Sequence, residues 1–224
     1  MKKLCAAVLA AICMSAAVSA LDLSVGGTFD YTLTHNFGRG KADSPFSKGV
    51  TSEKVQLDKK QTSNILGVKG FFDAQYAMVQ FGSNFMVGET YHESMYSTFN
   101  KKQILISKYE TTSEEVYLNL GLFGKYPFTA KAAKIYPLIG VDFDFAIFAK
   151  GKYDGKEKEL SANERKELNA YWFDVGTGAD IFLTKKLFLR PQLLFGIMMN
   201  QKDISELPHH GVKFNAEIGA GWKL

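Results

Sequence analysis

The sequence predicts an all-β fold: an eight-stranded antiparallel up-and-down transmembrane β-barrel with four long extracellular loops. Three observations predict it. Eight segments alternate with a period of two between an apolar and a more polar face, the apolar faces of those segments carry no charge, and the connections between segments are alternately short and long. A period of two is typical of strands with two unlike faces, and closing the sheet into a barrel leaves no unpaired edge in a membrane.

The first residues form a predicted export signal that precedes the barrel. Lys2 and Lys3 are followed by an apolar run from Leu4 to Val18 and by the small residues Ser19 and Ala20. A basic start, a short apolar run and small residues at its end are the pattern of a cleavable signal peptide. We therefore expect a signal peptide at 1–20 and a barrel domain at 21–224. Cleavage before Cys13, as in a lipoprotein, is the alternative.

The alternating segments define the expected strands. In the first, Leu21–Leu33, every odd position is apolar or glycine and every even position is polar or small. Seven further segments with this period lie at 66–72, 77–87, 116–122, 135–147, 171–183, 187–199 and 212–224. None of the 49 residues on the apolar faces is charged, whereas 11 of the 41 between them are. An arginine or lysine facing lipid at the bilayer midplane costs about 2–4 kcal/mol, which explains this exclusion.

The connections indicate which end of the barrel lies outside the cell. Those at 73–75, 129–133 and 184–186 are short, and those at 36–61, 88–113, 151–169 and 201–210 are long and polar. Short turns at one end and long loops at the other are typical of outer-membrane barrels, in which the loops are extracellular. Ser161 and Glu164 have the spacing of a capping box, which predicts a short helix in the third loop.

Composition excludes several classes of function. The formal charge is +4, and removal of Lys2 and Lys3 leaves about +2, so no nucleic-acid partner is expected. Both cysteines, Cys5 and Cys13, lie in the leader, so the exported chain has no thiol for a disulfide or a cysteine metal site. We expect no cofactor.

The polar face of the segments predicts a charged lumen. Its expected members are Asp30, Lys69, Asp142, Asp144, Asp174, Asp180, Arg190, Lys213 and Glu217. Eight strands enclose a space just wide enough for side chains, and buried charges need partners. We expect a plug of salt bridges, with a narrow path for small or apolar solutes as the alternative. A soluble lipocalin-like barrel also alternates, but its apolar face would point inward.

Other candidate sites are weaker. His92-Glu93-Ser94 resembles the His-x-Ser of lipid-deacylating barrels, which makes a lipid-modifying enzyme a distant alternative. His209 and His210, with His35 near the same rim, could bind a metal, although histidines in an exposed loop are usually solvated. We predict neither a catalytic nor a metal site.

The long loops are the expected surface for partners. They are rich in charged residues, namely Lys41, Lys48, Lys54, Lys59, Lys60, Lys152, Lys156, Glu157, Lys158, Glu159, Arg165 and Lys166. Binding residues often lie on loops held by a rigid scaffold. We expect contacts there with host ligands or anionic polysaccharide.

Two short stretches carry a resemblance to a known family. The stretch Tyr136-Pro137-Leu138-Ile139-Gly140-Val141 resembles the strand opening found in the OmpA–OmpX–OmpW-like superfamily of small barrels. Residues 190–193 resemble the same opening less closely. The last strand, 214–224, resembles the signal read by the outer-membrane assembly machinery, although it ends in Leu224 where phenylalanine is usual. The resemblance implies a place in the cell outer membrane, in contact with outer-membrane lipid. Because the sequence shows no segment after the eighth strand, the OmpX/OmpW type is the nearer comparison.

Overall fold

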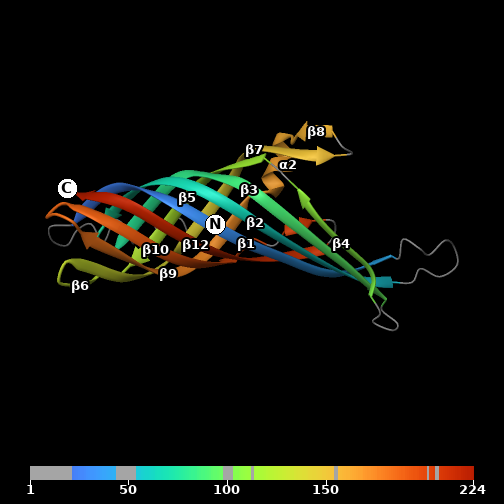
Figure 1. Ribbon diagram of the computed structural model, residues 1–224, viewed down its shortest axis with the longest axis horizontal. Coiled ribbons are helices and arrows are strands. Elements are labelled where there is room, and N and C mark those ends of the chain that lie inside the picture. The colour runs from blue at the N-terminus through green and yellow to red at the C-terminus, as the bar shows by residue number, and fades with distance from the viewer. Residues whose placement is uncertain are drawn as a thin grey trace, which may run out of the picture.

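Eight strands form a closed antiparallel ring (Figure 1). The computed structural model describes residues 22–43, 54–97, 103–111, 114–153, 156–200, 202–204 and 207–224; the expected signal peptide lies outside them. The ring order is β1-β2-β3-β5-β7-β9-β10-β12, and β12 closes it by pairing with β1. Its strands are β1 (Leu23–Asp43), β2 (Lys54–Ala74), β3 (Ala77–Ser97), β5 (Glu114–Lys125), β7 (Ala133–Tyr153), β9 (Ala170–Phe182), β10 (Leu187–Met198) and β12 (Leu207–Lys223). The predicted eight-stranded barrel is confirmed.

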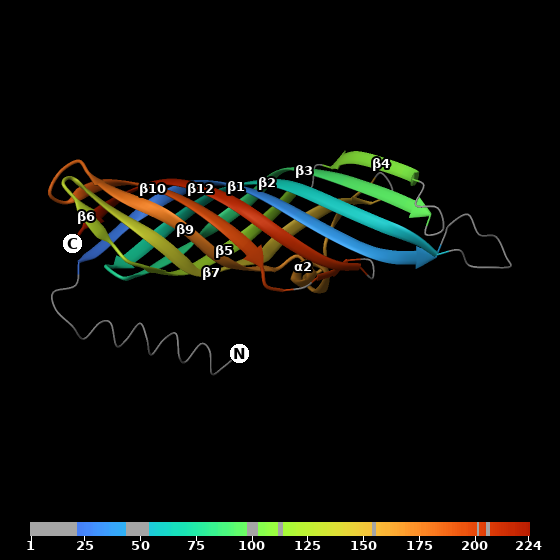
Figure 2. The same cartoon turned by 90° about the horizontal axis from the view of Figure 1, so that it is seen from below.

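The first two long connections are mostly strand rather than loop, so this part of the prediction was wrong. β1 and β2 stay paired as far as Asp43 and Lys54, and β3 continues to Ser97, where β4 (Gln103–Thr111) returns along it. The outer parts of these strands form a sheet that projects beyond the ring, here called the projecting sheet (39–43, 54–62, 89–97 and 103–111; Figure 2). Alternation does not reveal these strands because they extend beyond the apolar band, so neither of their faces meets the hydrocarbon core of the membrane and both can be polar.

The remaining connections follow the predicted rhythm. β6 (Phe128–Ala130) forms a tight hairpin with β7, and residues 75–76 and 183–186 are enough for the other two turns at that end. At the opposite end, β8 (Lys156–Glu159) pairs with β7 and β11 (Lys202–Ile204) pairs with β12. We call the end of the barrel with the three short turns the short-turn end, and the opposite end the outer end.

The third outer connection contains the predicted helix, α2 (Ala162–Glu167). Ser161 is its N-cap, the Glu164 amide donates to Ser161 Oγ at 3.4 Å, and the Ser161 amide donates to Glu164 Oε2 at 2.7 Å. This is the complete capping box expected from the sequence. In the parts of the chain that the structure describes, no helix is long and apolar enough to span a membrane.

The hydrogen bonds of the capping box should break in acid, when Glu164 becomes protonated. The amide of Ser161 holds the pKa of Glu164 at about 2, below its ordinary 4.5. A depressed pKa stabilises the helix above the ordinary value, and this stabilisation is lost as pH falls through the folded value. We expect hydrogen-exchange protection of the Ser161 amide to fall between about pH 4.5 and about pH 2. Glu164→Gln, which keeps an acceptor that does not titrate, should remove this pH dependence; unchanged protection in the native chain would contradict the prediction.

The two faces of the ring strands are divided as the alternation predicts. The outward side chains form an apolar band that includes Phe29 (67% exposed) and Ile218 (61% exposed), whereas the charged residues between them are buried inside. Aromatic rings gather at both borders: Tyr76, Tyr126 and Phe128 near the short turns, and Phe143, Phe145 and Tyr171 toward the outer end. An apolar band between aromatic girdles is the surface of a membrane-spanning barrel.

Inward-facing glycines allow large side chains to fill the interior. A Cβ at Gly26 would collide with the carbonyl oxygen of Ala220 and with the Phe71 ring, whereas one at the neighbouring, outward Gly27 would meet only the Lys69 carbonyl oxygen at 3.6 Å. Overpacking of this kind costs about 1–3 kcal/mol. Gly26→Ala should therefore lower the free energy of unfolding by this amount in a urea titration. The matched variant Gly27→Ala should stay within about 1 kcal/mol, and equal losses in both variants would contradict the packing argument.

Candidate functional site

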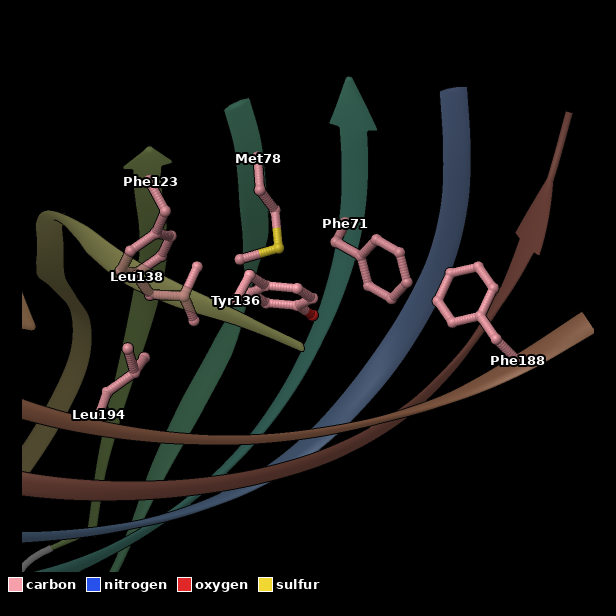
Figure 3. Close-up of a cluster of buried hydrophobic side chains, with 7 residues drawn as sticks. All are labelled: Phe71, Met78, Phe123, Tyr136, Leu138, Phe188 and Leu194. Carbon is pink, nitrogen blue, oxygen red and sulfur yellow. The ribbon is translucent and has the colours of Figure 1, made fainter. Parts of the chain in front are cut away.

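The candidate site is the barrel lumen, which is packed with side chains. Near the short turns it holds a cluster of seven buried apolar residues: Phe71, Met78, Phe123, Tyr136, Leu138, Phe188 and Leu194 (Figure 3). These residues come from the inward phase of five ring strands. The alternation of the sequence assigns that phase to polar residues, so it does not predict this cluster.

Arg190 lies against this cluster and is fully buried. Its Nε donates to Asp180 Oδ1 at 2.6 Å, and its Nη2 donates to Asp180 Oδ2 at 2.9 Å and to Asp73 Oδ2 at 2.6 Å. Lys125 Nζ reaches the same Asp73 oxygen at 2.5 Å. The guanidinium carbon lies 4.2 Å from the Phe71 ring centroid, within range of a cation–π contact. Charge pairing and aromatic packing together hold this cation in the interior.

A second ionic group occupies the middle of the lumen. Lys69 Nζ lies 3.3 Å from Glu217 Oε1 and 3.5 Å from Asp30 Oδ2. Gln80 donates to Glu217 Oε2 at 2.8 Å, and Asn215 donates to Asp30 Oδ2 at 2.9 Å. All five side chains are buried, so two carboxylates share one lysine, and each also accepts a hydrogen bond from an amide.

The third ionic group lies toward the outer end. Lys213 Nζ is 2.5 Å from Asp142 Oδ2 and 3.1 Å from Asp174 Oδ2. Asp144 is bound by neutral donors: the amides of Asn119 at 2.8 Å and Asn84 at 2.9 Å, and the Trp172 indole at 3.1 Å. The three groups fill successive levels of the barrel.

All nine residues of the expected lumen network lie inside the barrel, in these three groups. Sequence reasoning missed Asp73 and Lys125, because the alternating segments were ended one to three residues too early; continuing their phase would have found both.

At the short-turn mouth, the carboxylate of Asp22 forms ion pairs with Lys134 Nζ and Lys223 Nζ, each at 2.6 Å. Hydrogen bonds from Lys134 and Lys223 lower the pKa of Asp22.

The lumen contains more acid than base. The three groups hold seven carboxylates (Asp30, Asp73, Asp142, Asp144, Asp174, Asp180 and Glu217) and four cations (Lys69, Lys125, Arg190 and Lys213). Several buried acceptor oxygens in the described residues have no hydrogen-bond donor from the protein: Asp30 Oδ1, Asn84 Oδ1, Asn119 Oδ1, Asp174 Oδ1 and Asn215 Oδ1. The excess charge and the free acceptors suit positively charged solutes.

The histidine motifs do not assemble into a catalytic or metal site in the described residues. His92 and Ser94 lie on β3 in the projecting sheet, and the side chain of Glu93 lies outside the described residues. No group of three or more His, Cys, Asp or Glu that could hold a metal occurs in the described ranges. His35 and His210 instead flank the Phe37 ring, at centroid distances of 6.3 and 6.0 Å.

A closed eight-stranded antiparallel ring with a charged interior and an apolar outer band is an integral β-barrel of the outer-membrane type. No family model and no curated protein matches this chain. Among solved structures it is similar to the outer membrane protein OprG of Pseudomonas aeruginosa (13% identity, covering 92% of this chain and 96% of that one, TM-score 0.40). It is also similar to Ail of Yersinia pestis (9%, 91% and 99%, 0.34) and to the outer membrane protease OmpT of Escherichia coli (7%, 93% and 99%, 0.47).

Proposed function

We propose that this protein is a structural or interaction barrel of the cell outer membrane, exported by its signal peptide, with a closed lumen and a working surface at its outer end. The observation that carries the proposal is the burial of Arg190. Its side chain is fully buried and is held by carboxylates from two other ring strands. A guanidinium fixed in this way blocks the lumen on the short-turn side of Lys69 and Lys213. The C-terminal strand serves as the signal for the outer-membrane assembly machinery.

The projecting sheet supports an interaction role. It extends the ring with ladder-paired strands, so its outer surface is presented on a hydrogen-bonded scaffold. Rigid presentation lowers the entropy cost of binding. Host ligands or anionic polysaccharide are the proposed partners of this surface and of the outer connections.

Planar-bilayer conductance tests the closed lumen. We expect the reconstituted native barrel to show no stepwise openings, and Arg190→Ala to introduce them, because truncation removes a side chain that fills the lumen. Lys186→Ala, at an exposed short-turn position, is the matched control and should remain silent. Discrete openings of the native protein that are lost on changing Arg190 or Asp144 would overturn the closed-lumen proposal.

A narrow pore of the OmpW type is the second candidate, and one observation favours it. In the three groups, seven carboxylates face four cations, and the Oδ1 atoms of Asn84, Asn119 and Asp174 have no protein donor. A conducting form would therefore select cations. In the same recordings, a reversal potential that favours cations and shifts toward zero in Asp144→Asn would support the pore; anion selectivity would eliminate this reading.

A further inference from the structure

A row of basic and aromatic residues crosses the outer wall of the barrel. His210 of β12 lies opposite Phe37 of β1, Phe37 lies opposite Lys60 of β2, and Lys60 lies opposite His92 of β3. Directly opposed side chains of antiparallel strands point to one face, with Cβ atoms about 4.5–5.5 Å apart. Phe37 has the same strand parity as the lipid-facing Phe29 and Leu33. The four residues, here called the basic row, therefore face away from the lumen.

Three members of the basic row, Phe37, Lys60 and His210, border a hollow of about 460 Å³. The hollow is also lined by His35, Arg39, Asp58 and Lys59, and His92 lies next to it across the β2–β3 pairing. Asp58, the only carboxylate among these described lining residues, is bound by Arg39 Nε at 2.9 Å and Nη2 at 3.1 Å. Lys60 is exposed, and no ion pair within 4.0 Å holds it in the described residues. Its ammonium group is available to an anion from outside the chain, beside two imidazoles and an exposed phenyl ring.

The height of the basic row determines what can reach it. The apolar band on β1 and β12 ends at Leu33 and Phe214, four residues before Phe37 and His210. Four residues at about 3.3 Å each, on a strand tilted by about 40°, rise roughly 10 Å. The polar headgroup layer occupies the several ångströms directly beyond the hydrocarbon core, and a lysine stem can reach down toward it.

We propose that the basic row binds the phosphate-bearing headgroup of a lipid in the outer leaflet. Lys60 donates charge-assisted hydrogen bonds to the phosphate oxygens, and the ring nitrogens of His92 and His210 donate from the two sides. Phe37, which is 40% exposed at the centre of the row, packs against the apolar part of the same lipid. A membrane lipid fits better than a soluble polyanion because the apolar band ends roughly 10 Å below the row, so that a lipid held there by its headgroup can pack its acyl chains against Leu33 and Phe214.

Native mass spectrometry of the full-length barrel in detergent tests the site, with phosphatidylglycerol and phosphatidylcholine of identical acyl chains as probes. We expect the native protein to retain phosphatidylglycerol about five-fold better, since one basic residue near an anionic surface contributes about that factor. Lys60→Gln should remove most of this preference, and the triple variant Lys60→Gln, His92→Gln, His210→Gln should abolish it. Lys166→Gln, on exposed α2 away from the row, should keep it.

Three outcomes would overturn the proposal. The first is equal retention of the two lipids by the native protein, and the second is an unchanged preference in Lys60→Gln. The third is full displacement of phosphatidylglycerol by inorganic phosphate at equal concentration, which would show a site for soluble anions instead. Heat-modifiable gel migration verifies folding of each variant, and the single Lys60→Gln variant, whose side chain is exposed, keeps the test valid if the triple variant does not fold.

Discussion

Replacing Arg190 with alanine is expected to lower the free energy of unfolding by about 3–5 kcal/mol, the usual cost of removing one partner from a buried ionic network. The truncation leaves Asp180 and Asp73 buried with Lys125 as the remaining nearby cation, 2.5 Å from Asp73 and 3.8 Å from Asp180. It also removes the guanidinium from the Phe71 and Phe188 rings. Because the lost charge and the lost packing act together, the effect should exceed that of any surface substitution.

Urea titration in lipid vesicles, followed by heat-modifiable gel migration, measures this loss. Arg39→Ala is the matched control, because Arg39 also makes a two-point contact with an aspartate but its side chain is 73% exposed. Exposed pairs contribute about 0–1 kcal/mol, so the control should change little. Adding Asp180→Asn to Arg190→Ala should recover part of the stability. A loss below about 1 kcal/mol in Arg190→Ala would mean that the ionic cluster does not stabilise the barrel.

Arginine in place of Ile218 is expected to destabilise the membrane-inserted barrel by about 2–4 kcal/mol. Ile218 is 61% exposed in the middle of the apolar band, and its neighbours across the sheet are Phe29 and Pro191. A guanidinium at this point must enter hydrocarbon or pull water and headgroups toward it. The cost arises from the solvent and not from broken protein contacts.

The same vesicle titration distinguishes a membrane barrel from a soluble one. Tyr126→Arg, at the short-turn border of the band, is the position control and should cost about 0–1 kcal/mol. Ile218→Ala separates the loss of side-chain surface from the gain of charge. If Ile218→Arg matched Ile218→Ala in stability and made the chain soluble without detergent, the apolar band would not face lipid.

The local alternation of residues determined the ring. Lipid excludes charge from one face of each strand. The residues of each segment, from Leu21–Leu33 to 212–224, therefore show by themselves which side chains face outward. The same rule places Asp30, Lys69 and Arg190 on the inward face from the sequence alone. The capping box at Ser161 and Glu164 is equally local, and the structure contains it.

Only the tertiary structure decided which side chains meet. Arg190 contacts Asp73, 117 positions away in the chain, and Lys69 contacts Glu217, 148 positions away. Such pairings depend on strand stagger around the ring, which alternation does not encode. The projecting sheet was not predicted either, because strands outside the hydrocarbon core of the membrane need no alternating pattern. For the same reason, the row of His210, Phe37, Lys60 and His92 exists only through the register of four strands, although its members stand far apart in the sequence.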